Sequence, residues 1–324
     1  MTPDEGYAAL RDRAQLATLG VRARALDRLI ADGSAVRVAT GRYVTSEFWS
    51  RLFAEDRHLL AVLAATERSR TDAAAVLTSA AVLHQLPLWR HTPTHVHLAA
   101  PTFNGQLRDS PDVAHHRWRV KDADTVRISG ILCTSLARTV ADLLRYLDPV
   151  AGLAAADAAL RSVAWNPRTR TYNASLAEEF RLIIASKIRP GSRGAKTARW
   201  VLDLADGRSE SPGESASRML LIQLGFAPPQ LQVPVAGPDG RPYFVDFGLD
   251  EVDAWGEYDG TSKYLDPQIR GGALTLEEAI LNEKTREDWI RGTTHRKFGR
   301  WGTEHLTLPL LERRLRTFQI LPRR

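Results

Sequence analysis

Acidic side chains in the C-terminal third of this 324-residue sequence have the types and spacing best suited to chemistry. Asp246 and Glu257 each interrupt an apolar run typical of a β-strand, and Asp259 would share a strand face with Glu257. Like charges held this close repel and lose solvation, so folding tolerates them chiefly when a divalent cation neutralises them. Oxygen ligands suit magnesium, which polarises phosphodiesters and lowers the pKa of an attacking water.

The sequence therefore predicts a magnesium or manganese site with hydrolytic chemistry. The expected metal ligands are Glu214, Asp246, Glu257 and Asp259. The expected catalytic residues are Asp246, Glu257 and a lysine that positions the phosphate, either Lys263 or Lys284. Beside them, a phosphate-binding surface is expected from Arg286, Arg296, Lys297 and Arg300. A solvated helix face explains Arg286 nearly as well.

Three elements must hold these acids in place. Ser211, Pro212 and Glu214 predict a helix start with an S-x-x-E capping box, which is also the non-catalytic interpretation of Glu214. The runs at 233–235 and 242–248 predict a β-hairpin, because they are β-branched and aromatic and flank a Pro-Asp-Gly turn. A third strand is expected over residues 254–259. By alternation, Asp246 should lie on the opposite face from its neighbours Val245 and Phe247.

The segments SPGES, VDFG, GEYDG with SKY, EKTRED and FGRWGTEHL together resemble the PD-(D/E)XK nuclease superfamily, near the very-short-patch-repair endonucleases. The resemblance spans about residues 209–311 and implies a mixed central sheet flanked by helices. The resemblance matches Asp246 and Glu257 to the metal-binding acids of the family and Glu214 to the acid on its helix. Asp259 departs from the pattern, because it stands where the commonest motif has lysine. Either Lys263 or Lys284 replaces that lysine, or the site is catalytically weakened.

The N-terminal segment has the element order of a winged helix-turn-helix. A helix over 11–16, a turn at Gly20, a second helix over 22–30 and a hairpin around Thr40-Gly41 are expected, with Leu26, Leu29 and Ile30 buried. Such a module places its second helix in the major groove. The expected DNA-binding residues there are Arg22, Arg24, Arg28 and, on the wing, Arg42. The alternatives are arginines that solvate an exposed helix face and a winged helix that binds protein.

The segment from Asp56 to Arg161 alternates helix-like runs, among them residues 73–86, with strand-like runs, which predicts an α+β domain. Six of its histidines, His84, His91, His95, His97, His115 and His116, suggest a metal site, yet none forms an HExxH-type helical pair, so core or surface roles are favoured over metal binding. Cys133, the single cysteine, excludes an intrachain disulfide and is expected to be buried filler.

The glycine-centred helix-turn-helix ending in GRYV, followed by VLTSAAVLHQLPLW, THVHLAAP and ADAALR, resembles the AbiEi antitoxins of type IV toxin–antitoxin systems. The resemblance covers roughly the first half of the chain. It implies a winged helix that represses its own operon and a second domain that opposes a nucleotidyltransferase toxin.

Composition supports a folded chain of several domains. Hydrophobic residues make up 44% and charged residues 25%, the balance of a soluble globular protein. The N-terminus lacks a secretory pattern and no run is apolar enough to span a bilayer, so a cytoplasmic protein without membrane contact is expected. The predicted fold class is α+β multidomain, with a winged helix-turn-helix over 1–50, an AbiEi-like α+β domain over 56–180 and a PD-(D/E)XK-like domain over 200–324.

Charge is distributed unevenly around the acids. Residues 181–199 hold six basic and no acidic residues, residues 210–260 hold nine acidic and two basic, and residues 284–324 hold eleven basic and four acidic. The basic, glycine-bearing segment at 188–199 is expected to be a link. Basic flanks of this kind suit a polyanion partner.

Two hypotheses from different classes follow. The first is a DNA-binding, magnesium-dependent endonuclease. The second is an AbiEi-type antitoxin and autorepressor, in which the nuclease-like domain is a binding scaffold and the partner is a nucleotidyltransferase toxin. A third, in which the middle domain alone grips a protein partner, stays open.

Overall fold

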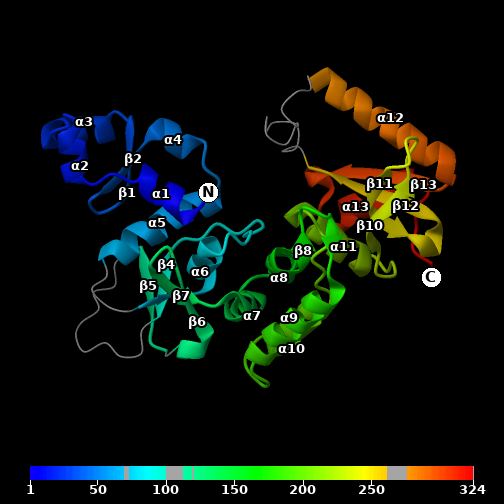
Figure 1. Ribbon diagram of the computed structural model, residues 1–324, viewed down its shortest axis with the longest axis horizontal. Coiled ribbons are helices and arrows are strands. Elements are labelled where there is room, and N and C mark those ends of the chain that lie inside the picture. Colours follow the sequence, from blue (N-terminus) through cyan, green and yellow to red (C-terminus); the bar gives the residue numbers. More distant parts are fainter. Residues whose placement is uncertain (69–72, 100–111, 119, 261–275, 324) are drawn as a thin grey trace. The chain divides into compact units, whose positions relative to one another are not determined.

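The computed structural model describes residues 1–68, 73–99, 112–118, 120–260 and 276–323. The chain divides into two compact units, the first formed by Met1–Ala159 with Glu178–Leu204 and the second by Leu160–Ala177 with Ala205–Arg324. Helices and mixed sheets occur in both units (Figure 1), so the fold is α+β and multidomain. The segments expected to form the first and middle domains fall in one unit, apart from residues 160–177, which cluster with the second.

The N-terminal part of the first unit contains three short helices and a hairpin. These elements are α1 (Pro3–Ala9), α2 (Arg13–Thr18), α3 (Ala23–Ala31), β1 (Ala35–Ala39) and β2 (Arg42–Thr45). Helix α2 begins at Arg13, two residues later than expected, because the Asp12 side chain caps it by accepting from the Gln15 amide at 2.7 Å. Gly20 and Gly41, at φ 84° and 78°, occupy the left-handed backbone that the two turns require. Leu26 is buried as expected.

An isolated β-bridge between two residues, which the sequence did not predict, links this helical segment to the hairpin. Arg11 and Tyr43 exchange both backbone hydrogen bonds at 3.0 Å, so Arg11 adds a third strand position beside β2. The Tyr43 ring is buried, and its hydroxyl accepts from Nε of Arg13 at 3.3 Å. The bridge therefore fixes α2, and with it the turn to α3, against the hairpin.

The rest of the first unit is built around a five-stranded sheet in the order β5-β4-β3-β7-β6. The elements of this part are α4 (Ser46–Ser50), α5 (Ala54–Arg68), β3 (Ala74–Ala75), α6 (Leu77–Leu83), β4 (Val96–Ala99), β5 (Val113–His116), η1 (Asp122–Asp124), β6 (Thr125–Ile128), β7 (Ile131–Thr134), α7 (Leu136–Tyr146) and α8 (Pro149–Ala164). The end of α8, from Leu160 onward, clusters with the second unit. Cys133 is fully buried in β7, as expected, and burial raises the pKa of its thiol to about 12.

One expected helix is wrong in its first part. Residues 73–86 are apolar without a clear period, and Ala74 and Ala75 form strand β3 between β4 and β7 before α6 begins. A short apolar run buried on both sides has no alternation from which a strand could be told from a helix.

The basic segment at 188–199, expected to be a link, instead forms the turn of a helical hairpin and the first part of its second helix. Helix α9 (Ala174–Lys187) and helix α10 (Ala195–Asp203) run antiparallel, since Arg181 pairs with Asp203 at 3.1 Å and Arg199 donates to the Ile188 carbonyl at 2.9 Å. Figure 1 shows the two helices side by side.

The second unit holds a four-stranded sheet in the order β10-β11-β12-β13. Its elements are β8 (Trp165–Asn166), β9 (Thr171–Tyr172), α11 (Pro212–Gln223), β10 (Gln230–Ala236), β11 (Pro242–Leu249), η2 (Asp250–Val252), β12 (Ala254–Asp259), α12 (Leu276–Thr294), β13 (Lys297–Gly302), η4 (Thr303–His305) and α13 (Leu308–Thr317). Strand β11 is antiparallel to both of its neighbours, β10 and β12, whereas β13 is parallel to β12. The helix, hairpin and third strand expected around the acids are all present.

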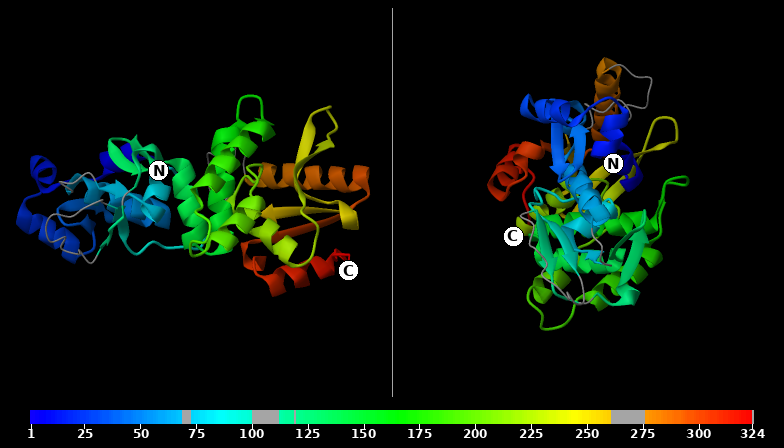
Figure 2. Two further views of the ribbon diagram at one scale, coloured as in Figure 1. Left: turned by 90° about the horizontal axis from the view of Figure 1, so that it is seen from below. Right: turned by 90° about the vertical axis from the view of Figure 1, so that its left-hand side faces the viewer.

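Helices cover both faces of this sheet. On one face, Trp255 and Phe298 pack with Ile290 of α12. On the other, the Trp301 indole donates to Oγ of Ser217 in α11 at 2.8 Å, and a Cβ at Gly299 would lie 3.0 Å from Ile320, just beyond α13. Figure 2 shows α12 and α13 on opposite sides of the strands.

Candidate functional site

Glu214 lies in the first turn of α11 and is 2% exposed. Ser211 is the N-cap, and Pro212 occupies the first helical position, as expected. The Glu214 carboxylate accepts from the Glu210 amide at 2.8 Å and from Oγ of Ser211 at 2.9 Å. Glu214 therefore does take part in capping, which was its non-catalytic interpretation.

Asp246 sits where the pairing of β11 with β12 ends. The register runs from Leu249 opposite Ala254 to Phe247 opposite Gly256, and beyond it the Asp246 carboxylate accepts from the Tyr258 amide at 2.9 Å. In the β11–β12 hydrogen-bond ladder, a side-chain oxygen of Asp246 thus takes the place of a backbone carbonyl as the acceptor for the Tyr258 amide. Continuing the register would set Asp246 opposite Glu257, so the two acids occupy matching positions on neighbouring strands.

The neighbours of Asp246 do not share a face, contrary to the expected alternation. Val245 packs in the cluster with Ile290 of α12, whereas Phe247 stacks on Trp301 at 5.6 Å on the α11 side. Across from Asp246, Gln232 has a left-handed φ of 51° and is left out of the β10–β11 pairing, although the register is the same on both sides of it.

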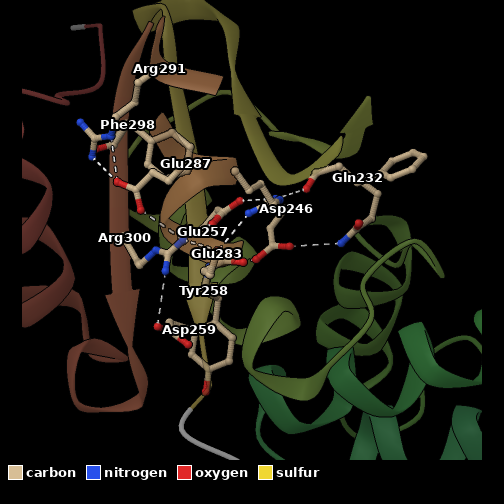
Figure 3. A network of polar contacts seen from close by, with 12 residues as sticks. Gln232, Asp246, Glu257, Tyr258, Asp259, Glu283, Glu287, Arg291, Phe298 and Arg300 are labelled. Carbon is tan, nitrogen blue, oxygen red and sulfur yellow. Dashed lines mark hydrogen bonds and ion pairs between the residues drawn. The ribbon is translucent and has the colours of Figure 1, made fainter. Parts of the chain in front are cut away.

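Gln232 joins the helical acid to the strand acid. Its Nε2 lies 3.2 Å from Oε2 of Glu214. The same Nε2 lies 3.3 Å from Oδ1 of Asp246 (Figure 3). One side-chain amide therefore bridges two carboxylates from α11 and β11. The predicted convergence of Glu214 and Asp246 is present, with a neutral donor between them.

Glu257 is held by two arginines. It is 5% exposed, and its Oε1 lies 2.6 Å from Nη2 of Arg286 while its Oε2 lies 2.8 Å from Nη2 of Arg300 (Figure 3). Arg286 comes from α12 and also donates to the Phe244 carbonyl. Arg300 comes from β13, whose parallel register places it beside Glu257. Both carboxylate oxygens are thereby occupied by charged donors.

Further acids surround the two guanidinium groups. Glu283 contacts both arginines, at 3.0 Å from Arg286 and 2.6 Å from Arg300, and Glu287 lies 3.2 Å from Arg300. Burial opposes the charged form of Arg286, but its hydrogen bond to Glu257 and the neighbouring charges of Glu257, Glu283 and Asp246 outweigh burial and raise its pKa. The same balance raises the pKa of Arg300. Both arginines therefore stay charged.

None of the described residues supplies the lysine that was expected beside the acids. Asp259 contacts Arg300 at 3.7 Å, so it joins the ion-pair network. Lys284 is exposed on α12 and has no polar contact within the described part of the chain. Arg286, two residues on, is the α12 cation that faces the acids. Lys263 lies outside the described residues.

These donors fit a metal ion only in part. Among the described residues, no group of three or more His, Cys, Asp or Glu side chains is arranged to hold one ion. Glu257 is a poor candidate because a cation would have to displace two arginines. Glu214 and Asp246 remain the two acids that a single small donor already contacts together.

The exposed face of α3 carries a second set of expected residues. Arg22, Arg24 and Arg28 are all exposed, and none of them has a polar partner in the regions that the structure describes. Arg42 differs, because its Nε lies 2.6 Å from Glu67 of α5 and its Nη1 lies 3.8 Å from Asp12. A half-buried ion pair thus occupies the side chain that was expected to touch phosphate from the wing.

Comparison with known proteins identifies relatives but no activity. "Uncharacterized protein MT2308" and "Uncharacterized protein Rv2248", from two strains of Mycobacterium tuberculosis, are each 32% identical over 262 residues, which are 81% of this chain and 83% of the relative. This chain belongs to their family. No family model matches the sequence.

The match covers most of the chain and most of each relative. Sequence reasoning missed Gln232, whose isolated amide in a strand-like run gave no signal. It also gave Arg286 and Arg300 a phosphate-binding role, whereas both pair with Glu257. No helix in the described ranges is long and apolar enough to cross a membrane.

Proposed function

We propose that this chain is a DNA-binding protein of the repressor type, in which α2, α3 and the β1–β2 hairpin act as a winged helix-turn-helix and α3 reads the major groove. The second unit is then a binding scaffold of PD-(D/E)XK type that does not hydrolyse DNA. This agrees with the resemblance of the first half to AbiEi antitoxins, whose partner would be a nucleotidyltransferase toxin.

The observation that carries the proposal is the unpaired arginine face of α3. Arg22, Arg24 and Arg28 are exposed and lack acidic partners in the described part of the chain, while Arg42 and Arg13 nearby are engaged. Exposed arginines are the residues that most often contact phosphates and guanine edges. The Arg11–Tyr43 bridge holds the helix pair rigidly, which recognition in a groove requires.

Ion pairing in the second unit favours binding over hydrolysis. Glu257 would be needed as a metal ligand, yet Arg286 and Arg300 neutralise it and none of the described lysines contacts the acids. Removing a partner from a buried ion pair costs about 3–5 kcal/mol, so opening this network for a cation is unfavourable.

DNA binding is tested with a fragment from upstream of its own gene and a scrambled fragment of equal length. We expect Arg24→Ala with Arg28→Ala to weaken binding and to lower the slope of log K against log salt by about 2, since each lost phosphate contact accounts for about 0.9. The matched control is Arg241→Ala with Arg313→Ala, two exposed arginines of the second unit. Equal affinities for the two double variants would argue against α3 as the reader.

A second candidate function is magnesium-dependent hydrolysis of DNA. It is favoured by the shared contact of Glu214 and Asp246 with Gln232, since these two acids would hold the cation in place of the amide. The cation would polarise the scissile phosphate. Incubation of supercoiled plasmid with the protein and magnesium or manganese decides between the candidates. Nicking that disappears in Asp246→Asn would support hydrolysis and overturn the scaffold assignment.

A further inference from the structure

The loop between α9 and α10 carries a basic surface that the proposed function does not use. Of the six basic residues between 181 and 199, Arg181 pairs with Glu178 and Asp203, Lys187 pairs with Asp124 at 2.6 Å, and Arg199 donates to a carbonyl. The other three, here called the hairpin patch, are Arg189, Arg193 and Lys196.

The hairpin patch is exposed and uncompensated. All three side chains are exposed, and none has a carboxylate partner among the residues that the structure covers. The segment from Arg181 to Arg199 contains no acid at all. Within the described part of the chain, Arg181 and Lys187 on α9 pair with carboxylates and Arg199 on α10 is held by a carbonyl, whereas the hairpin patch has neither kind of contact.

The tip is held in place by its own backbone. Nε of Arg145, in α7, donates to the Arg193 carbonyl at 3.1 Å, and a Cβ at Gly194 would lie 3.3 Å from the Arg145 carbonyl. Gly191 and Gly194 adopt left-handed φ values of 73° and 78°, so the loop turns tightly on α7. A fixed loop loses little entropy on binding, which favours a preformed surface.

The charge of the hairpin patch is not offset by nearby acids at the start of α10. Helix α10 has no acidic residue in its first turn, where acids are normally favourable, and Lys196 lies there instead. The like charges of Arg189 and Arg193 are close in sequence on the same loop. A partner with negative charge spaced along it would relieve both effects.

We propose that the hairpin patch binds the phosphate backbone of duplex DNA without reading bases, as a second contact surface in addition to α3. This inference rests on the proposed function. Two cations on the fixed loop and a third in the first turn of α10 suit contacts with phosphates. Backbone contacts of this kind add affinity and orientation but carry no sequence information. The patch would contribute equally to cognate and scrambled DNA.

The test uses the full chain with Arg189→Gln, Arg193→Gln and Lys196→Gln combined. The control combines Arg168→Gln, Arg241→Gln and Arg313→Gln, which removes the same charge from three exposed positions of the second unit. Affinity for cognate and scrambled duplexes is measured over a salt series. We expect the slope of log K against log salt to fall by about 2–3 for the patch variant, with an unchanged ratio between the two duplexes.

The outcomes separate this inference from the proposed function. If the patch variant matches the control while the α3 variant loses binding, the patch is not a DNA surface and the proposed function stands. If the patch variant loses binding while the α3 variant matches its control, the inference stands and α3 is not the reader. If the unmodified chain binds neither duplex at low salt, both are overturned. A selective loss for the cognate duplex alone would also contradict a base-independent patch.

Discussion

Replacing Glu257 with glutamine tests whether the acid network is an ion-pair core or a vacant cation site. The carboxylate accepts from Arg286 at 2.6 Å and from Arg300 at 2.8 Å, and it is 5% exposed. Glutamine keeps the shape but removes the charge. If the arginines depend on Glu257 for neutralisation, the second unit is destabilised. If Glu257 stood among uncompensated acids, the same change would relieve repulsion and stabilise it.

The expected magnitude follows from burial and from the other acids. Removing one partner of a buried pair typically costs about 3–5 kcal/mol. Glu283 also contacts both arginines, and the arginine side chains are 19% and 23% exposed, so part of their charge stays compensated. We therefore expect a loss near the lower end, about 3 kcal/mol in the free energy of unfolding of the second unit.

Urea unfolding in EDTA, followed by tryptophan fluorescence and circular dichroism, measures this change. The control is Glu312→Gln, which removes an exposed i,i+4 pair with Arg316 and should change stability by less than about 0.5 kcal/mol. A Glu257→Gln protein as stable as the control, or more stable, would refute the assignment of Glu257 to an ion-pair core.

Packing and pH give further predictions. Gly213→Ala would place a Cβ 2.1 Å from the Tyr258 ring and should destabilise the second unit by about 1–3 kcal/mol. Gly292→Ala, whose Cβ would meet no atom within 4 Å, should stabilise the second unit by up to about 1 kcal/mol, because alanine favours a helix more than glycine does. Thermal unfolding of the two variants checks both predictions. Burial lowers the pKa of His58 to about 3 and, together with His116 and other histidines, that of His97 to about 4. Because the unfolded chain binds protons near pH 6.5 and the folded chain does not, stability is full above that pH and should fall towards pH 4 by up to about 1.4 kcal/mol per pH unit for each histidine. Urea midpoints at several pH values check this, and the slope should flatten in His58→Gln.

Local signals predicted those elements whose ends are written in the sequence. Ser211 and Pro212 mark the start of α11, and the Pro238-Asp239-Gly240 turn marks the β10–β11 hairpin, because caps and turns depend on neighbouring residues alone. Strand β3 was missed since its two alanines are buried between β4 and β7, a property of distant segments. The α9–α10 hairpin was taken for a link because glycine and proline at its tip dominate the local pattern.

The candidate site was predictable in its acids and not in their partners. Period-two alternation placed Glu257 on a strand, and the capping pattern placed Glu214 at a helix start. The Gln232 contact involves a left-handed residue that is left out of the β10–β11 pairing, which no local preference of glutamine indicates. Val245 and Phe247 diverge, so the face of Asp246 could not be obtained by counting residues.

A buried carboxylate in the sequence predicts a neighbouring cation but does not show which cation it is. A strand acid flanked by apolar residues is explained equally by a divalent ion and by a guanidinium, since each offsets the same loss of hydration. For Glu257 the choice is made by Arg286, which is 29 residues away in sequence and reaches the acid only because α12 packs across the strands through Ile290. Arg300 reaches it only because β13 runs parallel to β12. The identity of the counter-charge is thus a property of the packed sheet, and chemistry inferred from the acids alone must be tested against it.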